Sequence, residues 1–193
     1  MPINVSPTRL DFAIADTIAA EAEPLPELLA RGITLGADEH LLIALAGAFW
    51  IYARSQRPSV QAAANHILAG TLAASILPHA LKLEFNQKRP DRYYLRAHCR
   101  GIPTSGKPND AFPSGHAVHM GALASAAAEL PRRYRNIAWF TASVLSLSRI
   151  VVLAHWTTDV VAGFAIGAGL ERIVRRFTGF PSSPDLARTQ RRM

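Results

Sequence analysis

The chain has 193 residues and a formal net charge of +7, from 21 Lys and Arg against 14 Asp and Glu. This length allows one domain with a substantial core and excludes two domains of ordinary size, so a single functional site is expected. The single cysteine, Cys99, excludes an intrachain disulfide and a cysteine-based zinc cage.

The positive charge fits either a nucleic-acid-binding protein or a membrane protein with basic loops. Here the basic residues lie between apolar stretches instead of along one polar helix face, so the sequence favours a membrane and predicts no nucleic-acid partner. Acidic side chains recur from Asp11 to Glu39 without an apolar stretch between them, so no cleavable signal peptide is expected.

The first segment, residues 8–34, places Leu10, Ile14 and Ile18 at helical spacing opposite acidic side chains. This pattern predicts an amphipathic helix at a membrane interface, interrupted by the prolines at positions 24 and 26. We therefore divide the single domain into an amphipathic N-terminal segment (1–34), a membrane helical core (35–178) and a polar tail (179–193).

Apolar runs in the core predict five membrane spans. The strongest run, residues 58–81, contains no Asp, Glu, Lys or Arg, and a shorter apolar run covers residues 41–53. Three further helices are expected over 117–130, 136–153 and 156–170. The predicted fold is all-α: a multi-pass membrane helical bundle of five spans, or six if the first segment also inserts.

The distribution of Lys and Arg among the expected loops predicts the orientation of the chain. Basic clusters at 54–57, 132–135 and 172–176 fall on one side, which should be cytoplasmic. The connection 82–116 and the turn near Ala154 then lie on the non-cytoplasmic side of the cell (inner) membrane. The connection 82–116 is also basic, although it lies on the side where few Lys and Arg are expected. Its charges therefore need a function other than orienting the chain in the membrane.

Three motifs fall on the non-cytoplasmic side: KLEFNQKRP at 82–90, PSGH at 113–116 and SRIVVLAHWTTD at 148–159. They match the signature KxxxxxxRP, PSGH and SRxxxxxHxxxD, and over residues 60–175 the chain resembles the type 2 phosphatidic acid phosphatase (PAP2) superfamily. The resemblance implies an all-helical phosphatase or lipid phosphatase, related in its site to the vanadium haloperoxidases. It also implies catalysis without a metal or other cofactor, through a phosphohistidine intermediate, with His116 as general acid.

His155 and Asp159 are four residues apart, so at the start of a helix they share one face. The carboxylate is expected to accept the Nδ1–H of the ring, which fixes the tautomer and leaves Nε2 free to attack phosphorus. In isolation, the same pair could be an interfacial histidine beside a helix-capping aspartate. Because the chain also contains the two other motifs, the catalytic interpretation is favoured.

The remaining motif residues suit a phosphate-binding pocket. The free backbone N–H groups of a helix that begins near Gly115 can bind an anion, and Ser114 is placed to cap that helix. Phosphoryl oxygens also need fixed cations around them, which explains the basic connection 82–116. The expected phosphate-binding residues are Lys82, Arg89, Ser114, Gly115 and Arg149.

Other interpretations stay open. The same site would serve an acid phosphatase on soluble phosphomonoesters or a vanadate-loaded peroxidase, and His119, His155, Asp159 and Asp110 could form a metal site. A protein that only binds phospholipid is expected to lack His155 or His116, and both are present. Among lipid substrates, undecaprenyl diphosphate, phosphatidic acid, phosphatidylglycerol phosphate and lipid A phosphates all fit the sequence, which also leaves the oligomeric state open.

Overall fold

The computed structural model describes residues 2–20, 32–33, 35–94 and 106–180. The expected proline break at positions 24 and 26, the middle of the connection 82–116 and nearly all of the expected polar tail lie outside the described residues.

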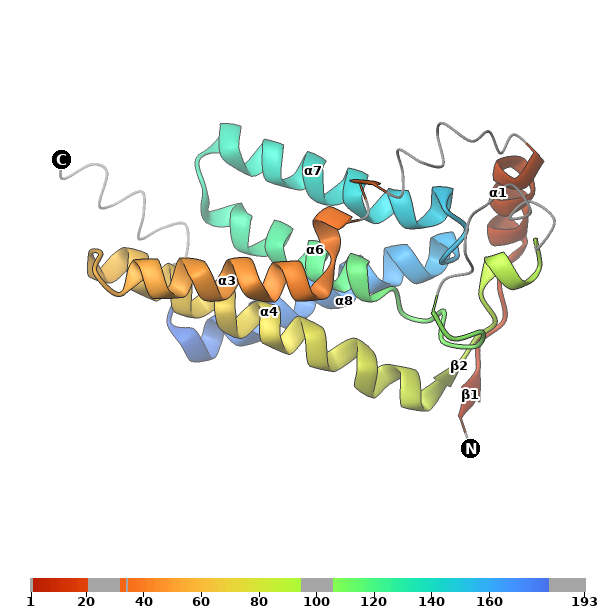
Figure 1. The fold of residues 1–193 in the computed structure, drawn as a ribbon, viewed down its shortest axis with the longest axis horizontal. Coiled ribbons are helices and arrows are strands. Elements are labelled where there is room, and N and C mark those ends of the chain that lie inside the picture. Colours follow the sequence, from red (N-terminus) through yellow and green to blue (C-terminus); the bar gives the residue numbers. More distant parts are fainter. Residues whose placement is uncertain (1, 21–31, 34, 95–105, 181–193) are drawn as a thin grey trace.

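Within the described residues, five helices form an elongated bundle and run roughly along its length (Figure 1). One of them, α6, lies in the middle of the bundle and contacts the other four, most extensively α8. The five helices are α3 (Glu39–Ala53), α4 (Pro58–Glu84), α6 (Gly115–Ala126), α7 (Arg132–Val151) and α8 (Thr157–Thr178). α6 begins inside the PSGH motif, so this motif stands at the start of the helix that contacts all the others.

Several short elements complete the end of the bundle where α4 ends and α6 begins (Figure 1). The strand β1 (Ile3–Asn4) pairs in parallel with β2 (Phe85–Asn86), with Ile3 opposite Phe85. The 3-10 helix η2 (Pro90–Arg92) follows β2 in the chain, and η1 (Leu35–Ala37) precedes α3. A third 3-10 helix, η3 (Ala127–Glu129), follows α6 directly.

The predicted amphipathic helix is present as α1 (Arg9–Ala20), which lies across this end of the bundle (Figure 1). Ile14 and Ile18 pack against buried core residues, whereas Leu10 is exposed. The buried Asp11 accepts hydrogen bonds from the backbone N–H of Thr158 at 2.9 Å and from its hydroxyl at 2.8 Å. Two of the three predicted interfacial residues therefore contact the protein, and a carboxylate ties α1 to the start of α8.

Local sequence explains where three of the helices begin or end. Asp38 caps α3 by accepting hydrogen bonds from two backbone N–H groups of its first turn. Pro58 stands at the first position of α4, where its missing N–H costs no hydrogen bond. α8 ends at Gly179, whose positive φ of 62° suits glycine.

Glycines allow α6 and α8 to cross very closely. A side chain built at Gly121 of α6 would overlap the carbonyl group of Phe164, and one at Gly167 of α8 would overlap the carbonyl group of Val118. Small residues at helix crossings let backbones approach in this way. The crossing holds the start of α6 beside the start of α8, so it brings the second and third motifs together.

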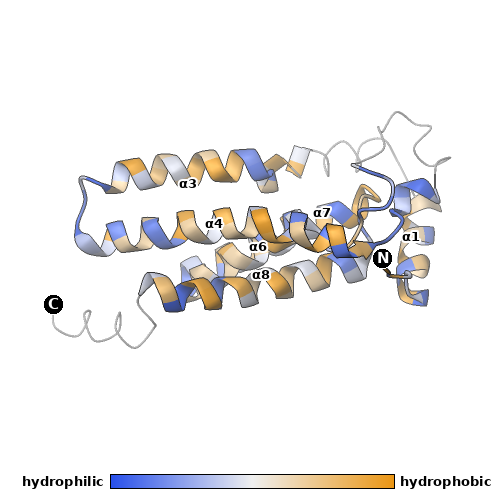
Figure 2. Cartoon of the chain, turned by 90° about the horizontal axis from the view of Figure 1, so that it is seen from below, coloured by the Kyte–Doolittle hydropathy of each residue, from blue (hydrophilic) through white to orange (hydrophobic). Residues whose placement is uncertain are grey.

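The number of membrane spans is not confirmed by the structure. Among the described helices, α4 is the one that is both long and apolar enough to cross a membrane, and Figure 2 shows its apolar stretch between hydrophilic ends. α3 has 15 residues, fewer than the roughly 20 that a span needs. The expected span over 117–130 is divided between α6, which has 12 residues, and η3. The confirmed part of the prediction is a mostly helical bundle.

Candidate active site

All three motifs meet in one cavity of about 240 Å³ at the end of the bundle crossed by α1. The predicted site residues that line it are Lys82, Arg89, Gly115, His116, Arg149 and His155. Two other predicted site residues, Ser114 and Asp159, have no exposed surface and are absent from its described lining. Most residues predicted for the site thus share one cavity. The residues in its lining can touch a ligand, whereas Ser114 and Asp159 can act only through other residues.

His155 lies in the turn between α7 and α8 and is 3% exposed. Its Nδ1 is 2.7 Å from the carbonyl oxygen of Ala111. A carbonyl can only accept, so Nδ1 carries the proton and the lone pair of the neutral ring is on Nε2. Nε2 lies 3.4 Å from Nη1 of Arg89, which also donates to the carbonyl oxygen of Ala154 at 3.0 Å. The nitrogen with nucleophilic character thus faces the cationic part of the cavity.

The prediction that Asp159 accepts the Nδ1–H of His155 is wrong in this structure. Asp159 Oδ2 lies 3.9 Å from Nδ1 and accepts a hydrogen bond from the backbone N–H of Trp156 at 2.9 Å. The physical reason is that α8 begins at Thr157, so Asp159 belongs to its first turn while His155 precedes the helix. Asp159 acts as a helix cap and as a carboxylate near the ring.

The surroundings of His155 favour its neutral form. Burial lowers the pKa of His155 well below its usual value, and the nearby charges of Arg89 and Arg149 lower it further. An uncharged imidazole keeps its Nε2 lone pair at neutral pH, which is what a nucleophile requires.

Asp110 organises two of the cations. Its Oδ1 accepts a hydrogen bond from Nε of Arg89 at 2.7 Å, and its Oδ2 lies 3.7 Å from Nζ of Lys82. Burial opposes ionisation of Asp110, but its hydrogen bond with Arg89 and the charges of Arg89 and Lys82 keep the pKa of Asp110 below its usual value. From the sequence, Asp110 is expected only as a possible metal ligand. Its position shortly before PSGH could have suggested a place near the site, but it does not reveal that Arg89 and Lys82 are its partners.

Arg149 supplies the third cation from the last turn of α7. Its Nε is buried and has no hydrogen-bond partner among the described residues. Its carbonyl oxygen accepts hydrogen bonds from the backbone N–H groups of Ala154 at 3.1 Å and His155 at 3.3 Å. The same residue therefore fixes the turn that carries His155 and offers an N–H donor to an anion.

Ser114 occupies the cap position of α6, but its side chain does not make the expected capping hydrogen bond. Its hydroxyl is buried and has no partner among the described residues. Its backbone N–H instead donates to the carbonyl oxygen of Asp159 at 3.3 Å, which links the starts of α6 and α8. The next two residues, Gly115 and His116, line the cavity.

The lining of the cavity also includes residues that were not predicted for the site from the sequence, namely Asp38, Glu39, His40, Pro78, His79 and Gly106, together with His119, which was predicted only as a possible metal ligand. Beside it lies a larger hollow of about 690 Å³, which shares Glu39, His79 and Lys82 with the cavity. Its lining includes apolar residues of α4, namely Ile76, Ala80 and Leu83. A polar, cationic cavity therefore adjoins a hollow with an apolar side.

The proposed metal ligands do not gather in the described part of the chain, where no group of three or more His, Cys, Asp or Glu side chains is placed to hold a metal ion. Asp110 is paired with Arg89, and Asp159 caps α8. The metal alternative therefore lacks a ligand set among these residues.

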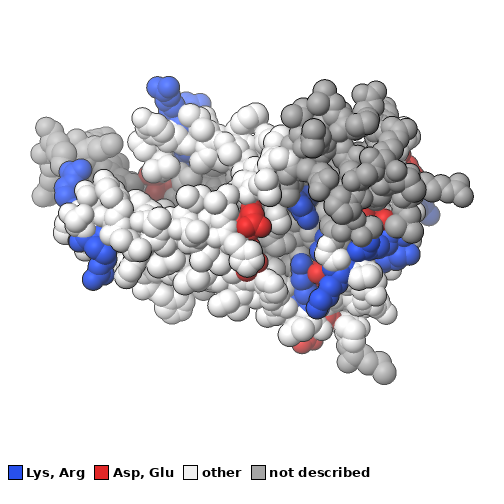
Figure 3. Space-filling model, viewed as in Figure 1, with Lys and Arg blue, Asp and Glu red and all other residues white. Residues whose placement is uncertain are grey.

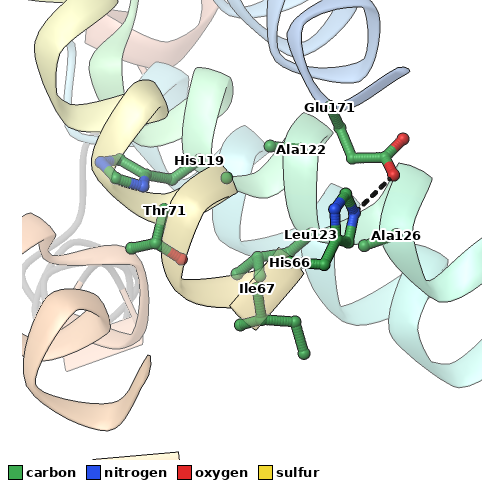
Figure 4. Close-up of a pocket in the computed structure, with 9 residues that line it drawn as sticks. His66, Ile67, Thr71, His119, Ala122, Leu123, Ala126 and Glu171 are labelled. Carbon is green, nitrogen blue, oxygen red and sulfur yellow. Dashed lines mark hydrogen bonds and ion pairs between the residues drawn. The ribbon is translucent and has the colours of Figure 1, made fainter. Parts of the chain in front are cut away.

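A second polar cluster joins the early part of α4 to the late part of α8, and Figure 4 shows its histidine and its carboxylate. His66 of α4 is 2.8 Å from Glu171 of α8, and Glu171 also accepts hydrogen bonds from Ser125 of α6 and from Arg175. The histidine and the carboxylate are each 1% exposed. Each carboxylate oxygen has a partner, so the cluster joins three helices without a vacant ligand position.

Comparisons with known proteins agree with the motifs. The profile of the PAP2 superfamily matches residues 63–181. A lipid A 1-phosphatase of Rhizobium johnstonii is 36% identical over 97 residues, which cover 49% of this chain and 39% of that protein. A lipid A 1-phosphatase of Rhizobium etli is 33% identical over 104 residues, covering 53% and 44%. The matched region thus spans about two fifths of the length of these curated relatives.

Two solved structures share the fold. The crystal structure of Aquifex aeolicus LpxE has a TM-score of 0.70 at 20% identity, covering 90% of this chain and 99% of that one. A transmembrane PAP2 type phosphatidylglycerolphosphate phosphatase from Bacillus subtilis has a TM-score of 0.60 at 20% identity, covering 89% and 86%. The family profile covers more than half of the sequence, and the chain belongs to the PAP2 superfamily.

Proposed function

We propose that this protein is a membrane-bound lipid phosphatase that hydrolyses a lipid phosphate through a phosphohistidine at His155. The observation that carries the proposal is a single cavity in which the Nε2 side of His155 meets His116 and three cations, Lys82, Arg89 and Arg149. The names of the two Rhizobium relatives make lipid A 1-phosphate a first candidate among the possible lipids.

In the proposed mechanism, Nε2 of His155 attacks phosphorus while the bond from phosphorus to the lipid oxygen breaks. His116 gives its proton to the leaving oxygen, and the cations stabilise the charge on the phosphoryl oxygens. Water then attacks the phosphohistidine, His116 takes one proton from it, and the P–N bond breaks to release phosphate and restore His155. Asp159 contributes a nearby carboxylate charge and holds the turn in place, and Gly115 lets the phosphate approach the start of α6.

A lipid substrate is supported by the surface of the protein. The hollow beside the cavity has an apolar side on α4, and its Ile76 and Leu83 are 69% and 79% exposed. Figure 3 shows that most Lys and Arg on this face gather toward the two ends of the bundle, and that the broad band between them is mostly uncharged apart from a small acidic patch. Such a band suits the hydrocarbon region of a membrane. The site end of the bundle would then face the non-cytoplasmic side.

The function is tested by measuring phosphate release from lipids in detergent micelles. We expect the purified full-length protein to hydrolyse at least one of phosphatidic acid, phosphatidylglycerol phosphate, lipid A 1-phosphate and undecaprenyl diphosphate. Its kcat/KM for that lipid should exceed the value for p-nitrophenyl phosphate by about 100-fold, since tail burial contributes about 0.8 kcal/mol per CH₂. Activity should persist in excess EDTA. Release from the soluble ester alone, or none from any substrate, would contradict the proposal.

Asp110→Ala should lower kcat/KM for the lipid at least about tenfold, because Arg89 and Lys82 lose the carboxylate that positions them. Asp110→Asn is the matched variant, since it can keep a hydrogen bond to Arg89 without the charge. Its activity should lie between those of the wild type and Asp110→Ala. Equal activity of all three proteins, with equal unfolding temperatures, would show that Asp110 does not position the cations.

A further inference from the structure

The lining of the cavity carries both signs of charge. Arg89, Arg149 and Lys82 are cations, and the start of α3 contributes the carboxylates of Asp38 and Glu39. A carboxylate that pairs with no cation repels a bound phosphate. Such a carboxylate in this lining therefore needs an explanation that concerns the rest of the substrate.

The two carboxylates differ in their hydrogen bonding. Asp38 Oδ1 accepts hydrogen bonds from the backbone N–H groups of His40 at 3.0 Å and Leu41 at 3.1 Å, so the helix start holds it in place. Glu39 makes no hydrogen bond or ion pair with the described residues, although three cations line the same cavity. Asp110 already pairs with two of those cations. Glu39 is thus an unneutralised charge in the lining.

The position of Glu39 relates it to the leaving group. Glu39 lines both the cavity and the adjoining hollow with the apolar side. A lipid with its phosphoryl group among the cations and its tail in the hollow passes the residues common to both, Glu39, His79 and Lys82. Lys82 is already paired with Asp110 at 3.7 Å, whereas the side chain of Glu39 pairs with none of the described residues. The group that passes Glu39 is the one directly attached to the phosphoryl group under attack.

A buried histidine in the same lining has one ring nitrogen without a partner. His119 is 2% exposed and lines the cavity, with Nε2 at 3.3 Å from the hydroxyl of Ser75. Its Nδ1 is buried and has no hydrogen-bond partner among the described residues. An uncharged leaving group can lie beside the carboxylate of Glu39 without charge repulsion, whereas a charged one cannot.

We propose that Glu39 is a specificity-determining residue that selects lipid monophosphates over lipid diphosphates. With a diphosphate, the terminal phosphoryl group binds the cations and the second phosphate becomes the leaving group, next to the charge of Glu39. Two like charges a few ångströms apart repel each other strongly in a partly buried site. A monophosphate has an uncharged alcohol at this place. The selection rests on the proposed lipid phosphatase function and narrows its substrate class.

The test compares lipids that differ only by one phosphate: phosphatidic acid with diacylglycerol diphosphate, and lipid A 1-phosphate with lipid A 1-diphosphate. The full-length protein and its Glu39→Gln variant are assayed for kcat/KM on each pair in the same micelles. We expect Glu39→Gln to raise kcat/KM for the diphosphate about tenfold relative to the monophosphate of the same lipid. The value for the monophosphate should change less than about threefold.

Glu84→Gln is the matched control. Glu84 is exposed at the end of α4, only two residues after Lys82, and does not line the described cavity or hollow. This substitution removes the same charge, so a general effect of net charge would move both variants equally. Glu84→Gln should leave the diphosphate-to-monophosphate ratio unchanged.

The outcomes separate the inference from the proposed function. A wild-type protein that hydrolyses none of these lipids or the others tested above contradicts the proposed function itself. Wild-type hydrolysis with the same ratio in Glu39→Gln, or with an equal shift in Glu84→Gln, contradicts the role of Glu39 and leaves the function standing. A fall in monophosphate turnover alone would show that Glu39 binds the substrate instead of rejecting a second phosphate.

Discussion

His155→Ala is expected to reduce kcat for the lipid substrate by at least about 10⁴-fold and to abolish formation of a phosphoenzyme. His79 in the same lining also has its Nδ1 on a backbone carbonyl, that of Ser75 at 2.8 Å, but the Nε2 of His155 lies 3.4 Å from Nη1 of Arg89, where the phosphoryl group is expected to bind. The measurement is rapid quenching of the protein with ³²P-labelled lipid. In the wild type it should reveal protein-bound phosphate that is labile in acid and stable in base.

Two further variants make this result specific. His155→Gln can keep a hydrogen bond to the carbonyl of Ala111. It therefore tests whether activity is lost because the nucleophile is missing or because the turn collapses. We expect this variant to be as inactive as His155→Ala and to unfold near the wild-type temperature. His116→Ala keeps the nucleophile but lacks the proton donor, so it should still form a trace of phosphohistidine while turning over about 10²- to 10⁴-fold more slowly. Substantial turnover by either His155 variant would refute the nucleophile assignment.

Gly167→Ala should destabilise the protein by about 3 kcal/mol, the upper range for overpacking, although alanine favours helices more than glycine does. The added methyl group would overlap the carbonyl group of Val118 at the crossing of α6 and α8, and backbone cannot move aside as a flexible side chain can. Separation of these helices would also move His116 away from His155. Activity should therefore fall together with the unfolding temperature, measured by thermal unfolding in detergent.

Gly169→Ala is the matched control on the same helix. An added methyl group there meets no atom within 4 Å, so the substitution should be neutral or stabilise by up to about 1 kcal/mol through helix propensity. The prediction is that the two alanine substitutions change the stability of the protein in opposite directions. Equal unfolding temperatures for Gly167→Ala and the wild type would mean that α6 and α8 do not cross as closely as described.

The sequence predicted the helices best where a signal was local. The run without charged residues and the proline at its start predicted α4, which the structure places at Pro58–Glu84. The apolar run over 117–130 was less informative, because apolarity continues through the point where α6 gives way to η3. Hydrophobicity reports the environment of a residue, and it does not report whether the backbone keeps one hydrogen-bond pattern.

The site was also predicted well where the signal was local and poorly where it depended on distant residues. Spacing, residue type and the resemblance to the PAP2 superfamily predicted that His155, His116 and the three cations share one site, and all five line one cavity. Spacing misassigned the hydrogen bond of His155, because a separation of four residues pairs side chains only when both stand in the same helix. The true acceptor, Ala111, is 44 residues away in the sequence, and a backbone carbonyl leaves no residue signature.

The motifs alone therefore determined what kind of reaction the chain is built for, since a reaction depends on which chemical groups are present in which order. Only the tertiary structure decided which group each of them contacts. It paired Asp110 with Arg89 and Lys82, and it placed Glu39 in the lining of the same cavity. Such contacts depend on how α3, α4 and the connecting segments pack, and packing sums many weak interactions between residues that are distant along the chain.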